Sequence, residues 1–120
     1  MTDETSPIDD DAGADVLEDA QQAIADARRR LAEVPAHVVV TNHAMGLYEL
    51  AAIHLSASPP DLASATLAID ALGALVEGLG ERLGPETPTL RDALANIRVA
   101  FVQIKKAQAD AGAATADGDA

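Results

Sequence analysis

Residues 62–83 read LASATLAIDALGALVEGLGERL, and this stretch decides the fold class. Apolar residues recur in it at intervals of three and four, which is the repeat of one face of an α-helix rather than the period of two of a β-strand. We therefore expect a helix that begins at Pro60 or Asp61 and ends near Leu83. The apolar face of this helix consists of Leu62, Ala65, Ile69, Leu72, Val76, Leu79 and Leu83.

A second helical pattern follows the break GPETPT at 84–89, where Thr87 is the expected N-cap and Pro88 the first helical residue. The predicted helix runs to about Gln108. Its apolar residues are again spaced by three and four, so it can pack along the helix before it. These residues are Leu90, Leu94, Ile97, Phe101 and Ile104.

Two more helices are predicted on the N-terminal side. The first runs from about Asp15, which could form a capping box with Glu18, to Glu33. Its heptad seam is spaced 3, 4, 3, 4, 3 and consists of Leu17, Ala20, Ile24, Ala27, Leu31 and Val34. The next helix, from about Ala36 to Ser56, is apolar on most sides, so we expect it to lie at the centre of the fold or under a second subunit.

Composition and length place these helices in one domain. The chain has 120 residues with 48% hydrophobic and only 2% aromatic residues, which favours an all-α fold with a core of Ala, Leu, Val and Ile. The formal net charge is −12, and nine of the twenty acidic residues lie in the first fifteen or the last eleven positions. We therefore expect disordered acidic tails at 1–14 and 109–120 around a helical bundle at 15–108, with about four helices in two antiparallel hairpins.

Charged residues predict the register of the second hairpin. In an antiparallel pair of helices, the residue numbers of facing positions add up to a constant, and both Asp70 with Lys105 and Glu77 with Arg98 give 175. We expect these two ion pairs along one edge of the hairpin. Each exposed pair would contribute only about 0.2–1 kcal/mol, so they would fix direction more than stability. Repetition every seven residues also occurs on any solvated helix face, and that alternative stays open.

Several classes of function find no support in the sequence. Without cysteine, the chain has no disulfide and no thiolate site, and we see no His or Glu pattern of a metal site, no nucleophile motif and no phosphate loop. Basic residues cluster only at 28–30, which does not suggest nucleic-acid binding. We expect no cofactor, no membrane span and no signal peptide, and therefore a cytoplasmic protein.

The residues singled out as a possible interaction or packing surface lie on the two central helices. Interior glycines cost about 1 kcal/mol relative to Ala, so Gly73 and Gly80 suggest close approach of another helix, or alternatively a ligand groove. Histidines on the preceding helix suggest edge packing more than metal binding or acid–base chemistry. The whole set is His43, Leu47, Tyr48, Leu50, His54, Gly73 and Gly80.

Five segments carry a family resemblance, namely VPA at 34–36, LAAIHL at 50–55, PPDL at 59–62, AIDALGALVE at 68–77 and LRDALANIRVAFVQ at 90–103. Through them the chain from Val34 to about Gln108 resembles a widespread family of small bacterial all-helical proteins grouped as a domain of unknown function. The resemblance implies two helical hairpins around Pro-containing breaks. It implies no catalytic residues.

These observations lead to three functional hypotheses. The first is a non-enzymatic interaction or scaffold protein that self-associates, most simply as a homodimer, or that binds another protein. The second is a helical bundle that binds a small molecule beside Gly46, Gly73 or Gly80. The third is an enzyme that uses His43 or His54 with Glu49 or Tyr48.

Overall fold

The computed structural model describes residues 5–119, and it describes the side chains of residues 12–113. All regular structure in this range is helical: α1 (Thr5–Glu33), α2 (Ala36–Leu55), α3 (Leu62–Leu79), the 3₁₀-helical segment η2 (Gly80–Glu86) and α4 (Thr87–Asp119). The expected all-α class is therefore confirmed. Residues 1–4 and 120, which belong to the expected tails, lie outside the described residues.

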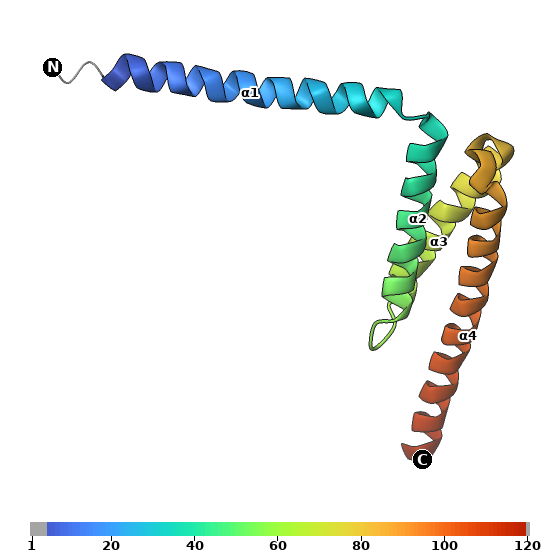
Figure 1. The fold of residues 1–120 in the computed structure, drawn as a ribbon. Coiled ribbons are helices and arrows are strands. Elements are labelled where there is room, and N and C mark those ends of the chain that lie inside the picture. Colours follow the sequence, from blue (N-terminus) through green and yellow to red (C-terminus); the bar gives the residue numbers. More distant parts are fainter. Residues whose placement is uncertain (1–4, 120) are drawn as a thin grey trace. The chain divides into compact units, whose positions relative to one another are not determined.

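The chain divides into two compact units, residues 1–36 and 37–120. The first unit is α1 alone, and the second contains α2, α3, η2 and α4 (Figure 1). The predicted pairing of the first two helices as a hairpin stays a prediction. The second predicted hairpin is present, because α3 and α4 run antiparallel and pack against each other.

Helix boundaries differ from the expected ones mainly at the ends of the chain. α1 begins ten residues before Asp15, so the expected capping box lies inside the helix, and α4 continues past Gln108 to Asp119. The sequence at 109–119 has five alanines in eleven residues, which favours the extension of α4, since Ala has the highest helix propensity.

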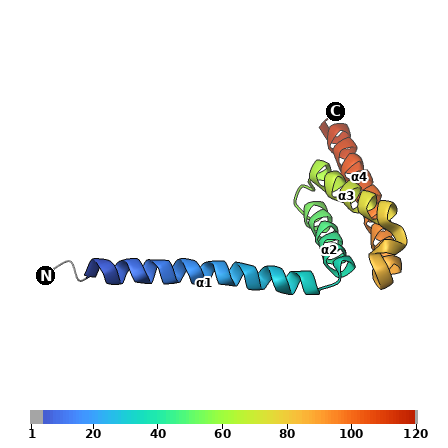
Figure 2. The ribbon, with the colours of Figure 1, turned by 90° about the horizontal axis from the view of Figure 1, so that it is seen from above.

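The core of the second unit follows the predicted apolar faces of the last two helices. α3 contributes Ala65, Ile69, Leu72 and Val76, and α4 contributes Leu90, Leu94 and Ile97. Figures 1 and 2 show α2 beside α3, and the contribution of α2 consists mostly of small residues. The buried residues of α2 are Thr41, Ala44, Ala51 and Leu55.

The turn between α3 and α4 is built around two glycines. α3 ends at Leu79, four residues earlier than expected, because Gly80 adopts φ 53° and caps it. Gly84 adopts φ 83° and ψ −152°, a region that is open essentially to glycine alone. Between the two glycines, Leu83 is fully buried and anchors the turn in the core.

Thr87 closes this turn in a different way from the expected N-cap. Its backbone is already helical, with φ −53° and ψ −48°. Its hydroxyl donates toward the carbonyl oxygens of Gly84, at 2.7 Å, and Gly80, at 3.2 Å. The side chain therefore satisfies carbonyl groups of the turn instead of accepting from amide groups of α4.

Candidate functional site

The surface of α2 that faces away from the core is a candidate site in the second unit. Opposite the buried residues lies a stripe with spacings of 4, 3, 4 and 3, which we call the outer face of α2. Leu50 on it is 42% exposed and Ile53 is 64% exposed. The outer face consists of Val39, His43, Gly46, Leu50 and Ile53.

Charge is nearly absent around this outer face. Between residues 36 and 60, Glu49 is the one Asp or Glu, and there is no Lys or Arg. A Cβ atom added at Gly46 would meet nothing within 4 Å, so the backbone of α2 is bare at the middle of the stripe. Such a surface suits an apolar partner that approaches closely, and it offers little to a charged ligand.

The five residues of α2 that were predicted to form an interaction surface differ in their exposure. His43 and Leu50 are exposed, whereas Leu47, Tyr48 and His54 are half-buried, and Leu47 and Tyr48 pack against the core. Ile53, which sequence analysis did not select, is more exposed than Leu50. The signal that could have found it is the row of alanines at 44 and 51, which marks the opposite side as the buried one.

The two glycines that were predicted to allow close approach of another helix have other roles in the structure. Gly73 is buried beneath the guanidinium group of Arg98, because an added Cβ would lie 2.7 Å from Arg98 Nη2. Gly80 is not inside α3 but caps its C-terminus. The expected close approach of a helix is therefore replaced by a side chain at Gly73 and by a turn at Gly80.

One of the two predicted ion pairs is present. Arg98 Nη2 lies 2.6 Å from Glu77 Oε1, whereas no ion pair within 4.0 Å joins the described side chains of Asp70 and Lys105. A pair that the register analysis missed links Arg91 to Glu81 of η2 at 3.3 Å. The antiparallel register therefore holds near the turn and does not bring charges together farther from it.

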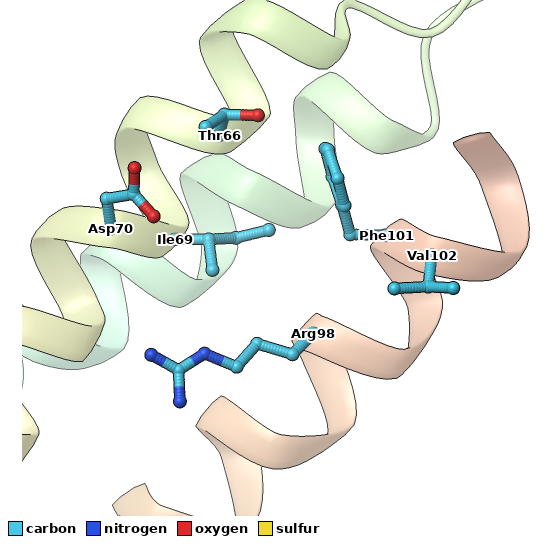
Figure 3. Close-up of a pocket in the computed structure, with 6 residues that line it drawn as sticks. All are labelled: Thr66, Ile69, Asp70, Arg98, Phe101 and Val102. Carbon is cyan, nitrogen blue, oxygen red and sulfur yellow. The ribbon is translucent and has the colours of Figure 1, made fainter.

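A groove lies between α3 and α4 on the side of the hairpin that carries Asp70. It has a volume of about 320 Å³ and lies where Asp70 of α3 and Arg98 of α4 line its sides (Figure 3). The apolar lining comes from Ile69, Phe101 and Val102.

A second groove lies where the start of α2 meets the turn. His37, Thr41 and Met45 line it together with Pro85 and other residues. The ring of His37 lies against Gly84, since an added Cβ there would be 2.6 Å from His37 Cδ2. The hydroxyl of Thr41 donates to the carbonyl oxygen of Leu83 at 3.4 Å. These contacts seat α2 on the turn and give His37 a packing role.

Asp61 organises the connection between α2 and α3. Its carboxylate accepts from the backbone amide of Ser64 at 3.0 Å and from the Ser64 hydroxyl at 2.7 Å. These two hydrogen bonds lower the pKa of Asp61, and the nearby His54 ring, 4.0 Å away, acts in the same direction. The amide of Asp61 also donates to the carbonyl oxygen of His54 at 2.9 Å. His54 thus helps to close the connection.

Other site chemistry is sparse in the part of the chain that the structure describes. No group of three or more His, Asp or Glu residues is arranged to hold a metal ion there. One helical stretch, Leu62–Ala113, is long and apolar enough by composition to cross a membrane, but it spans α3, η2 and α4 and is broken at Gly84. A third of its most apolar window is buried within the protein.

Comparison with protein-family models, curated proteins and solved structures gives no match. The resemblance to the bacterial helical family therefore stays a prediction.

Proposed function

We propose that the protein is a non-enzymatic, self-associating helical protein, and that the outer face of α2 packs against the same face of a second copy. The observation that carries the proposal is the exposure of Leu50 and Ile53 on a helix that has a single charged residue, Glu49. A small helical unit with a core built largely from Ala and Leu gains stability by burying such a face.

The outer face is complementary to itself across a two-fold axis. In an antiparallel crossing centred on Gly46, facing residue numbers add up to 92, which puts Val39 opposite Ile53 of the second copy. The bare backbone at Gly46 allows the two helices to approach closely at the crossing point. The same register places Glu49 near His43 of the second copy, so the one carboxylate at this face meets a basic group.

The test is the molar mass of the full chain, measured by light scattering over a range of concentrations. We compare the wild type with the double variant Leu50→Glu/Ile53→Glu, which places carboxylates in the proposed contact. We expect the molar mass to fall by half, because burying unpaired charges opposes association. Both positions are exposed in the single chain, so the variant keeps its helical circular dichroism.

The matched control is Val99→Glu on α4, where an apolar residue that is 56% exposed also becomes glutamate. This variant keeps the mass of the wild type. A wild-type mass of 12.3 kDa at every concentration, or an unchanged mass in the α2 variant, contradicts the proposed contact.

A second candidate function is the binding of a small apolar molecule in the groove between α3 and α4. Its volume of about 320 Å³ lies at the lower end of the range for ligand pockets, and Arg98 lies at its rim. Decanoate, which joins an apolar chain to a carboxylate, is a suitable probe. Binding would raise the melting temperature saturably in the wild type and not in Val102→Glu, which blocks the groove. An equal rise in both proteins rejects this candidate.

A further inference from the structure

The first unit is a single helix with an exposed apolar side. α1 has 29 residues, which corresponds to a length of about 44 Å. Leu17 is 65%, Ile24 52% and Leu31 59% exposed. A helix draws most of its stability from packing its apolar face, and this unit holds no second element that could cover that face. The exposed seam of α1 therefore requires a partner outside this unit.

Large and small residues alternate along the seam. In an antiparallel pair, facing residue numbers add up to 51, which sets Ile24 opposite Ala27 and Leu31 opposite Ala20 of the second copy. Leu17 faces Val34 at each end. Every inner layer then combines one large and one small side chain, so the two helices keep an even distance. A parallel pair would alternate layers of two alanines with layers of two large residues.

Charge along α1 favours the same direction. Residues 5–19 contain six acidic residues and no basic one, whereas residues 20–33 contain three arginines, Asp26 and Glu33. The first half therefore carries −6 and the second half +1. A parallel pair would place the two strongly acidic halves side by side. In the antiparallel register, residues 5–16 face positions 35–46, beyond the end of α1 at Glu33, so the two acidic segments lie at opposite ends of the pair and apart from each other.

We propose that α1 pairs with α1 of a second copy as an antiparallel two-stranded coiled coil. This contact uses a different helix from the proposed α2 contact and does not depend on it. Arg28 and Arg30 border the seam, and in this register they face Ala23 and Gln21 of the second copy. Arg29 lies on the outer side, where it pairs with Asp26 of its own helix at 2.8 Å.

Disulfide trapping tests the direction and register, since the natural chain has no cysteine. Full-length Ala20→Cys and Leu31→Cys proteins are mixed in equal amounts, oxidised gently and weighed as intact species by mass spectrometry. The proposal expects mostly the mixed disulfide, because these two positions face each other across the seam. The matched control mixes Gln22→Cys with Arg29→Cys, whose numbers also add up to 51 but which lie on the outer side, and it yields little disulfide.

Other outcomes overturn the proposal. Disulfides mainly between identical chains show a parallel pair. Equal trapping in the seam and control mixtures shows random collision. Absence of trapping shows that α1 does not pair with α1 of a second copy. The remaining partner for the seam is then another part of the same chain.

A second experiment separates this contact from the α2 contact. Ile24→Glu is combined with Leu50→Glu/Ile53→Glu, and each variant is compared with the wild type by light scattering. If both contacts exist, each variant alone lowers the mass and the combination gives 12.3 kDa. We expect Ile24→Glu to weaken the α1 contact at least about tenfold, because it buries a carboxylate in the seam. If Ile24→Glu leaves the mass unchanged while the α2 variant lowers it, the proposed coiled coil is wrong and the proposed function stands. If Ile24→Glu lowers the mass while the α2 variant leaves it unchanged, only the proposed α2 contact is wrong.

Discussion

Glycine positions in the second unit have unequal importance, and backbone angles decide which matter. Gly84 combines φ 83° with close contact to the ring of His37, whereas Gly78 lies in α3 with open space around it. The sequence places Gly84 in the break GPETPT and Gly78 in a predicted helix, but it does not show that Gly84 contacts His37. Gly80 was expected in a helix interior, although it caps α3, because its sequence neighbours continue the apolar spacing to Leu83.

Gly84→Ala should destabilise the protein. The backbone conformation alone costs a non-glycine residue about 1–3 kcal/mol, and the methyl group must also displace His37. Gly78→Ala is the matched control and should stabilise α3 by about 0.5–1 kcal/mol, because alanine restricts the unfolded chain more than glycine. Urea unfolding measures both free energies. Equal effects of the two substitutions would contradict this description of the turn.

Asp61 gives the stability a dependence on pH. Because its two hydrogen bonds with Ser64 lower its pKa in the folded protein, the ionised carboxylate favours folding above the ordinary Asp pKa of 3.8. This contribution is lost as the pH falls through the lowered folded value. We expect the wild type to melt above Asp61→Ala at pH 7, with the difference shrinking below pH 3.8. A constant difference between pH 7 and pH 2 would show that the cap does not act through its charge.

At the scale of elements, the predicted apolar faces are those that pack. The apolar face of α3 could be predicted because apolar residues recur along it at regular helical spacing. Ile69, Leu72 and Val76 on this face are all buried. The buried face of α2 was harder to predict, because nearly all residues of this helix are apolar and its buried residues are mostly small. Ala44 and Ala51 are fully buried, whereas the larger Leu50 and Ile53 lie outside. Size complementarity between helices is a tertiary property that one sequence pattern does not contain.

Leu83 is the residue through which η2 joins the core. Its side chain is fully buried, although it lies in a short 3₁₀ segment between two glycines. Leu83→Ala should cost about 3–5 kcal/mol, because it leaves a cavity where α3, α4 and the turn converge. Arg82→Ala, at an exposed neighbouring position, should change the free energy of unfolding by less than about 0.5 kcal/mol. Similar losses in the two variants would mean that the turn is not packed as described.

At the scale of the whole molecule, sequence analysis predicted the helical class and the second hairpin but not the division into two units. Heptad spacing at 17–34 predicted an apolar seam, yet such spacing is the same whether a seam faces its own chain or another. The exposed surface of α2 was also predicted only in part. Hydrophobic residues on α2 were recognised, but their assignment to core or surface depends on contacts with α3 and α4.

Self-association at either surface makes stability depend on protein concentration. A dimer is favoured by mass action, so the melting temperature should rise as the chain is concentrated from the micromolar to the millimolar range. Scanning calorimetry of the wild type measures the rise, and the combined variant with substitutions in α1 and α2 should lose it. A melting temperature independent of concentration in the wild type would contradict both proposed contacts.

The continuous path of α3, η2 and α4 also has a consequence for the order of folding events. These elements follow one another along the chain, and the contacts among them are the most extensive in the second unit. Closing such a short loop costs little chain entropy, so folds rich in sequence-local contacts cross their barrier quickly. We expect the hairpin of α3 and α4 to form the nucleus and α2 to dock onto it afterwards. Shortening the Leu83 side chain to alanine would then slow refolding. Shortening the Leu55 side chain of α2 to alanine would mainly accelerate unfolding.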